Sequence, residues 1–295
     1  MSSAAPTPTA NFERVVLATD FSPCSEKALH HALAIARDAG STFYLVHVVS
    51  SLGFALAGPG TAAAAVELAG RDARELAQKL VQDGSLAGVP HEVVVRQGQP
   101  WEELERVVRQ YHADLVVIGT HGRTGLRKLA LGSVAEDIFR HASCPVLTVG
   151  PRAPEQAPAE LKALRFLYAT DLSAESLAAV PFAVALAQRH QAELTVLHPL
   201  EDPKAAGRRE LEAQLRELVF DARLPYPPTA RVETGPADET ILRVAEQQKA
   251  HLIVLGLRSP DTYVDHLGWL HAYKIVCEAR CPVLTIRSRA EALSG

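Results

Sequence analysis

The sequence predicts two tandem doubly wound α/β domains, each with a five-stranded parallel sheet flanked by helices. Three observations lead to this fold class. Short apolar runs alternate with segments whose apolar residues recur at helical spacing, as in parallel α/β sheets. The run 115–118 has four consecutive aliphatic residues, which is typical of a strand buried on both faces. The third observation is that the chain contains the same pattern twice, and its 295 residues suit two domains.

The repeat is visible in two motifs. The segment Cys144–Val149 recurs 137 residues later as Cys281–Ile286, whereas Ala18–Asp20 recurs 151 residues later as Ala169–Asp171. The second copy is therefore about 14 residues shorter, and the deletion lies between His47 and Gly98. From these landmarks we predict a disordered tail at 1–12, domains at 13–150 and 164–289, and a Pro/Ala-rich linker at 151–163.

Each copy is predicted to have the same order of elements. In the first copy we expect strands at 14–20, 42–49, 91–96, 114–118 and 145–149, and helices at 23–40, 62–83, 100–111 and 132–141. Ser22 and Pro23 supply an N-cap and a proline at the first helical position, and Gly40 a C-terminal stop. The Gly/Ala-rich stretch 53–70 is interpreted as a loop or lid. In the second copy, Pro181 should kink or split the first helix.

Composition narrows the function classes. The net charge of −4 gives no reason to expect a nucleic-acid or anionic-membrane partner, and no apolar segment approaches the length of a spanning helix. Four cysteines form neither a disulfide framework nor a complete zinc site, so we expect a reducing, cytoplasmic location. The N-terminal residues lack the basic and apolar regions of a signal peptide.

A glycine-rich loop after the fourth strand of the first copy is the main candidate site. It runs from Gly119 to Gly125, and Gly132 and Ser133 then open a helix. A strand, a glycine loop and a helix N-terminus together are the parts of an anion site in α/β proteins. Gly119, Gly122 and Gly132 can take positive φ angles and let backbone N–H groups approach an anion, and the basic residues Arg123, Arg127 and Lys128 could pair with phosphate oxygens.

Alternative interpretations of this loop remain open. It could be a plain turn, and its basic residues could be solvated surface charges. His121 could act as a general base or have no special role. Asp20, at the end of the first strand, would face Gly119 across one crevice if the two strands are neighbours, and could accept a hydrogen bond from a ribose or base.

The spacing Gly119-x2-Gly122-x9-Gly132-Ser133 is similar to the nucleotide-binding signature of the universal stress protein family. The similarity extends to Ala18–Ser22, to His47 and Val48, and to Ser143–Val146, so that two tandem copies cover essentially the whole chain. The resemblance implies strand order 3-2-1-4-5 in each sheet and an adenine-nucleotide site that holds ATP, or ADP or AMP, with which Mg²⁺ is compatible.

By this resemblance, Asp20 and Val48 would lie by the adenosine, Gly119 and Gly122 by the ribose and phosphates, and the start of the last helix at the phosphates. The expected binding residues are Ala18, Thr19, Asp20, Val48, Gly119, His121, Gly122, Arg123, Gly132, Ser133 and Val134. No catalytic residue and no metal ligand is assigned.

The second copy departs from the signature. Gly122 is replaced by Ser259, Gly132 by Trp269 and Ser133 by Leu270. Asp261 and Asp265 also stand in the part of the loop that is basic in the first copy. A bulky, apolar and acidic loop disfavours phosphate, so we expect one nucleotide per chain, in the N-terminal domain.

The leading function is an ATP-binding regulatory protein of the stress response. One alternative is a slow ATPase, although the sequence has no Walker-type lysine to support it. The other is a scaffold that binds no nucleotide. The resemblance also implies an internal pseudo-dimer of the two domains through their last strands, and a homodimer of tandem chains is plausible from the edge strands.

Overall fold

Each half of the chain folds into its own five-stranded parallel sheet. The computed structural model describes residues 11–50, 59–120, 131–161, 163–201, 207–220, 222–257 and 266–287, with the backbone alone at 59–60 and 266–269. The chain divides into two units. The N-terminal unit comprises Phe12–Val149 with Glu155–Ala157, and the C-terminal unit comprises Pro158 onwards with Gly150–Pro154.

The N-terminal unit alternates strands and helices in the predicted order. Its strands are β1 (Arg14–Ala18), β2 (Thr42–Ser50), β3 (His91–Gly98), β4 (Leu115–Gly119) and β5 (Val146–Val149). Its helices are α1 (Pro23–Ala39), α2 (Pro59–Gln82), α3 (Pro100–Gln110) and α4 (Ser133–His141). All pairings are parallel, in the order β3-β2-β1-β4-β5. This is the strand order that the family resemblance implied.

The C-terminal unit repeats this arrangement. Its strands are β6 (Arg165–Ala169), β7 (Glu193–Leu200), β8 (Thr229–Thr234), β9 (Leu252–Leu257) and β10 (Val283–Arg287). Its helices are α5 (Ala174–Leu177), α6 (Val180–Arg189), α7 (Arg208–Glu217), α8 (Ala237–Gln247) and α9 (His266–Glu278). The order is β8-β7-β6-β9-β10, again parallel throughout. The predicted fold class is confirmed in both halves.

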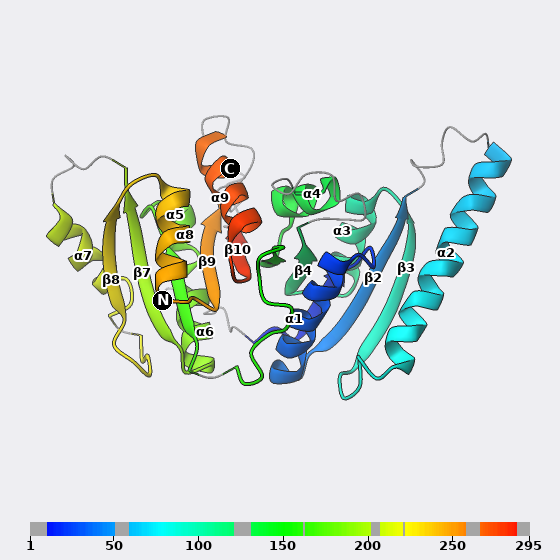
Figure 1. Cartoon of the computed structure of the whole chain (residues 1–295), viewed down its shortest axis with the longest axis horizontal. Helices are drawn as coiled ribbons and strands as arrows, with labels where there is room; N and C mark the ends of the chain where they lie inside the picture. The colour runs from blue at the N-terminus through cyan, green and yellow to red at the C-terminus, as the bar shows by residue number, and fades with distance from the viewer. Residues whose placement is uncertain are drawn as a thin grey trace, which may run out of the picture. The chain divides into compact units, whose positions relative to one another are not determined.

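The inner strands are buried on both faces, as their continuous apolar runs predicted. Val15, Val16 and Leu17 of β1 have no exposed surface, and the same is true of Leu115–Val117 in β4. Helix α1 packs against β1 and β4, α2 against β2 and β3, and α3 against β2, β3 and α4 (Figure 1). Parallel strands joined by helical crossovers are covered in this way on both faces.

Local signals in the sequence set the ends of the first helix of each copy. Ser22 caps α1 by accepting a hydrogen bond from the Ser25 amide at 3.3 Å, and Gly40 ends the helix at φ 68°. In the second copy, Pro181 lies in the first turn of α6, and the helix is split into α5 and α6. A proline ring cannot continue an α-helix from the preceding turn without a clash, so the predicted split is confirmed.

The prediction of a loop or lid at 53–70 is wrong for its described part. Residues 59–70 belong to α2, and 51–58 lie outside the described residues. Alanine has the highest helix propensity, and the alanine run outweighs the cost of Gly70 within the helix. Helix α2 has 24 residues and its counterpart α7 has 10, so the 14-residue difference between the copies is a difference in helix length.

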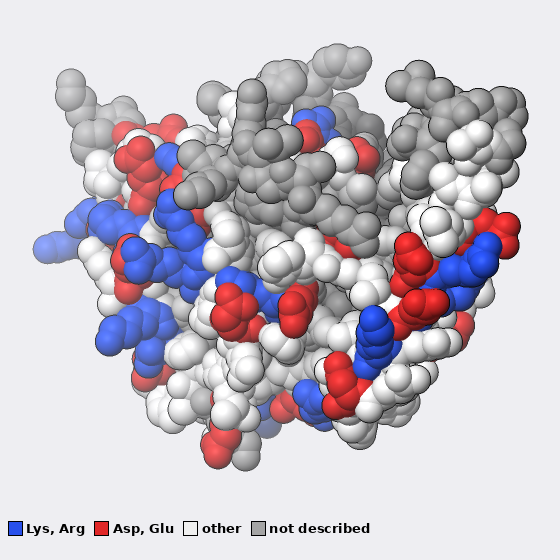
Figure 2. Space-filling view, turned by 45° about the vertical axis from the view of Figure 1, so that its right-hand side comes forward, with Lys and Arg blue, Asp and Glu red and all other residues white. Residues whose placement is uncertain are grey.

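The surface carries charges of both signs. Figure 2 shows acidic and basic side chains interspersed on the face that it displays, in keeping with the small net charge of −4. Some are paired one helical turn apart, for example Arg71 and Glu67 on α2 at 3.4 Å. Within the described part of the chain, no helix has both the length and the hydropathy needed to span a bilayer.

Candidate functional site

The loop after β1 is held by its own side chains. Thr19 Oγ1 accepts a hydrogen bond from the Phe21 amide at 3.0 Å, and Asp20 Oδ1 accepts one from the Ser22 amide at 3.0 Å. Phe21 lies between them at φ 58°, a left-handed conformation that is costly for a bulky residue. The two hydrogen bonds stabilise this conformation, and the loop therefore presents Asp20 at the carboxyl edge of the sheet in a fixed position.

His47 from β2 fixes the same loop from the side. Its Nδ1 donates to the Thr19 carbonyl at 2.7 Å, and its ring lies 5.1 Å from the ring of Phe21. Because the carbonyl can only accept, the neutral imidazole carries its proton on Nδ1. In the sequence, His47 is part of a motif with no role assigned to it, whereas in the structure it supports the Asp20 loop.

The glycines of the site serve a different purpose from the one we predicted. Gly119 lies in extended strand, and a Cβ there would be 2.8 Å from the Cys24 carbonyl oxygen. Gly132 has φ −63° and ψ 152°, which any residue can adopt. Neither of these two glycines uses the positive φ that the sequence allowed for. Gly119 is instead required because β4 ends against the first turn of α1, where a side chain does not fit.

Helix α4 begins beside this strand. Gly132 is its N-cap residue, and its amide donates to the Thr120 carbonyl at 2.8 Å. Ser133 and Val134 form the first turn and are exposed, with Val134 at 36%. A helix start directs backbone N–H groups and the positive end of the helix dipole towards the space in front of it. Here that space is the crevice at the end of β4.

A pocket of about 210 Å³ occupies this crevice. Eight predicted site residues line it, drawn from four separate stretches of the chain: Ala18, Thr19, Asp20, Val48, Gly119, Gly132, Ser133 and Val134. The other three predicted residues, His121, Gly122 and Arg123, lie outside the described residues, as do Arg127 and Lys128. The structure thus brings together every predicted site residue that it describes.

The pocket also has an apolar wall that was not predicted from the sequence. Pro100 and Leu104 of α3 and Ile138 of α4 line it, together with Val46, Ile118 and Ala135 from the strands and helix already named. A proline that opens a helix directly after the third strand was a usable signal, since helix starts gather at the carboxyl edge of a parallel sheet. The pocket is therefore apolar on the α3 side and polar at the Asp20 loop and the α4 start.

The C-terminal unit retains half of this site. Leu172 has φ 66°, its amide donates to Thr170 Oγ1 at 2.9 Å, and Asp171 Oδ1 accepts from the Ser173 amide at 2.9 Å. His198 Nδ1 donates to the Thr170 carbonyl at 2.9 Å, as His47 does in the first copy. The loop after the first strand is therefore repeated hydrogen bond for hydrogen bond.

The other half of the site differs between the units. Helix α9 begins at His266, four residues before Leu270, the residue that matches the helix-start Ser133. Leu270 is 56% exposed. Trp269 lies within α9, whereas its match Gly132 is the N-cap residue that precedes α4. The remaining departures, Ser259, Asp261 and Asp265, lie outside the described residues. The helix start of the first site therefore has no equivalent at the same position of the second unit.

Comparisons with known proteins agree on one family. The model of the universal stress protein family matches residues 11–150 and 163–287. A universal stress protein of Methanocaldococcus jannaschii is 34% identical over 139 residues, which cover 47% of this chain and 82% of the relative. One from Mycolicibacterium smegmatis is 27% identical over 296 residues and is matched over 97% of its length and 93% of this chain.

A solved structure supports the fold over both units. A universal stress protein of Archaeoglobus fulgidus superposes with a TM-score of 0.76 at 20% identity, covering 95% of this chain and 99% of that one. The family model alone spans most of the sequence in two tandem matches, as the internal repeat predicted. The chain is therefore a tandem member of the universal stress protein family.

Proposed function

We propose that the protein is a stress-response regulator that binds one adenine nucleotide per chain, in the pocket of the N-terminal unit. One observation carries the proposal: the described residues matched to the family's nucleotide signature converge on a single pocket. The convergence joins the ends of β1, β2 and β4 with the start of α4. Ligands of open α/β sheets bind at this edge, where the strand order reverses.

The Asp20 loop and the apolar wall would hold the adenosine. Asp20 offers carboxylate oxygens as acceptors for a ribose hydroxyl or a base amine. Pro100, Leu104 and Ile138 offer an apolar surface to the base. A volume of about 210 Å³ is small beside the roughly 300–1,000 Å³ of pockets that enclose a drug-sized ligand. The pocket therefore suits the base and sugar, with the phosphates extending towards α4.

The start of α4 would hold the phosphates. Its first-turn amides and the Ser133 hydroxyl are donors, and the helix dipole favours negative charge at this end. Arg123 from the glycine loop would add a cation. The nucleotide would be ATP, or ADP or AMP, and Mg²⁺ is compatible with the phosphates.

Ligand released from freshly purified protein tests the proposal. We expect mass spectrometry to find an adenine nucleotide in about one copy per chain. The substitution Gly132→Trp places at the helix start the residue that the second copy has, and should weaken ATP binding at least about tenfold by blocking the phosphates. The opposite change, Trp269→Gly, is the matched control and should leave ATP affinity as it is. Unchanged affinity in Gly132→Trp would remove the phosphate assignment.

Slow ATP hydrolysis is the second candidate, because the carboxylate of Asp20 lies in the pocket. Product formation from ATP and Mg²⁺ by nucleotide-free protein, lost in Asp20→Ala at saturating ATP, would favour it. If the parent protein forms no product, hydrolysis is ruled out and nucleotide binding remains as the function.

We also propose that two tandem chains associate as a cytoplasmic homodimer. The support is the family resemblance and the presence of an edge strand in each sheet, β3 and β8. Sedimentation equilibrium would give twice the chain mass of 31.8 kDa if this is right, and the chain mass itself if it is wrong.

A further inference from the structure

Helices α8 and α9 of the C-terminal unit occupy the positions of α3 and α4, the two helices that line the pocket in the N-terminal unit. The 137-residue repeat matches Val134 with His271 and Ile138 with Ile275. An apolar pocket residue is thus replaced by a titratable one, on the side of the crevice where the two units differ.

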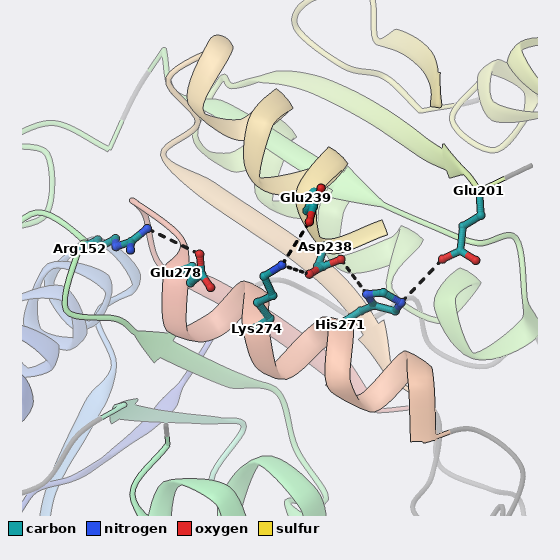
Figure 3. A network of polar contacts seen from close by, with 7 residues as sticks. All are labelled: Arg152, Glu201, Asp238, Glu239, His271, Lys274 and Glu278. Carbon is teal, nitrogen blue, oxygen red and sulfur yellow. Dashed lines mark hydrogen bonds and ion pairs between the residues drawn. The ribbon is translucent and has the colours of Figure 1, made fainter. Parts of the chain in front are cut away.

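His271 joins a charged cluster that bridges the two helices (Figure 3). Its Nδ1 donates to Asp238 Oδ1 at 2.9 Å, and Lys274 Nζ lies 2.5 Å from Asp238 Oδ2. Asp238 belongs to the first turn of α8, whereas His271 and Lys274 both come from α9. We refer to Asp238, His271 and Lys274 as the clamp.

The clamp is anchored on a buried carboxylate. Asp238 is 5% exposed, and burial alone would raise its pKa. The hydrogen bonds from Lys274 and His271 outweigh burial and hold the pKa of Asp238 below its usual value. The same contact with Asp238 raises the pKa of Lys274. Both partners are therefore charged at neutral pH, and the clamp is an ion pair with an additional histidine donor.

Further acidic side chains surround the clamp. Glu201, at the end of β7, lies 3.7 Å from His271 Nε2, and Glu239 lies 3.7 Å from Lys274 Nζ. At the far end of α9, Glu278 pairs with Arg152 at 3.7 Å. Figure 3 shows this chain of contacts running along α9. The cations Lys274 and Arg152 are already paired with carboxylates. A phosphate brought to this side of the crevice would therefore meet negative charge.

The start of α9 adds a steric difference. The helix extends four residues beyond the start of α4, and at 1.5 Å per residue this moves its N-terminus by about 6 Å. The donors of a helix start are therefore displaced from the position that they have in the first unit.

We propose that the C-terminal unit is held closed by its own side chains: the clamp ties α8 to α9 beside the position of the N-terminal pocket, where His271 replaces the pocket-lining Val134, and nucleotide leaves this unit unchanged. The clamp itself stands independently of nucleotide binding. The statement about nucleotide rests on the proposed function. One half of the protein would then respond to ligand, while the other keeps one conformation.

Hydrogen exchange of the full chain tests the clamp. The substitution Asp238→Asn keeps the shape of the side chain and removes its charge, so α9 amides should exchange about tenfold faster or more. The matched control is Glu246→Gln in the same helix, because Glu246 forms an exposed pair with Arg280 at 3.2 Å. This control should change exchange less than about twofold.

A second variant tests the clamp if Asp238→Asn fails to fold. His271→Val introduces the residue of the N-terminal copy and should also accelerate exchange in α9, by a smaller factor because Lys274 remains paired. If Asp238→Asn and His271→Val both exchange like the Glu246→Gln control, the clamp contributes nothing and the proposal is wrong.

Adding ATP to the unmodified protein separates the two proposals. We expect slower exchange around Asp20, in α3 and at the start of α4, with no change in α8 and α9. Protection of α8 and α9 would overturn self-closure while leaving the proposed function intact. Protection nowhere would overturn the proposed function, and the clamp would still be decided by its own variants.

Discussion

Asp114 and His251 are matched residues in the two copies. Both accept backbone hydrogen bonds at the start of the first strand, one through a carboxylate and the other through an imidazole. Asp114 accepts hydrogen bonds from the Glu13 amide at 2.8 Å and the Arg14 amide at 3.0 Å. His251 Nδ1 accepts one from the Arg165 amide at 3.1 Å. Each residue precedes the fourth strand of its sheet and secures the start of the first. Because the imidazole must be unprotonated to accept, of these two contacts only that of His251 is sensitive near neutral pH.

The stability of the C-terminal unit should therefore fall as pH drops below about 6.5. Burial, and then the nearby positive charge of Arg165, lower the pKa of His251. A pKa that is lower in the folded than in the unfolded state gives stability that is full above the unfolded value and is lost as pH falls through the folded one. The loss should be about 1 kcal/mol, the worth of one hydrogen bond.

Thermal unfolding between pH 7.5 and 5.5 measures this dependence. His251→Asn retains a neutral acceptor and should remove part of the pH dependence. Asp114 has a pKa raised chiefly by burial, so its contribution to stability falls as pH rises through its own, acidic range, and it should not contribute in this window. An Asn variant with the same pH profile as the parent would show that His251 is not responsible.

At the scale of elements, the N-cap serine of the first helix should stabilise both copies, and in the N-terminal copy it also contacts a residue that lines the pocket. Ser22 and Ser173 accept hydrogen bonds from Ser25 and Ser176, both at 3.3 Å. Ser22→Ala and Ser173→Ala should each cost about 1 kcal/mol in the free energy of unfolding, measured in urea. Only Ser22→Ala should also weaken ATP binding, because Ser25 lines the N-terminal pocket. Equal effects of the two substitutions on ATP binding would contradict this account.

The elements were more predictable than the site because their signals are local. The apolar runs, the cap at Ser22 and the break at Pro181 each act within a few residues, and each was predicted correctly. The alanine-rich start of α2 was assigned both to a loop or lid at 53–70 and to a helix from 62, since small residues suit a loop or a helix until packing decides. The role of Gly119 was also missed, because a sequence shows that a glycine is needed without showing whether φ or a close contact requires it.

Long-range partners that belong to no motif could not be predicted from the sequence. Pro100, Leu104 and Ile138 lie on apolar helix faces that resemble any core surface, and only the fold turns them towards a pocket. Asp238 and His271 are 33 residues apart, and nothing in either segment indicates that they meet. The motifs identified one side of the N-terminal pocket, and the tertiary structure supplied the other.

At the scale of the whole molecule, the internal repeat provides a control for function. Both units keep the loop after the first strand, with its left-handed residue and its supporting histidine. They differ at the helix that closes the crevice, which starts with Gly132 and Ser133 in one unit and one turn earlier in the other. Duplication followed by change on one side would leave one nucleotide-responsive unit and one closed unit.

Calorimetric titration with ATP of the full chain and of two matched variants tests this asymmetry most directly. We predict one site per chain in the parent protein, marked loss of affinity in Asp20→Ala, and an unchanged site in Asp171→Ala, because only Asp20 lines the N-terminal pocket. Two equivalent sites per chain, or a single site that survives Asp20→Ala and is lost in Asp171→Ala, would contradict the account.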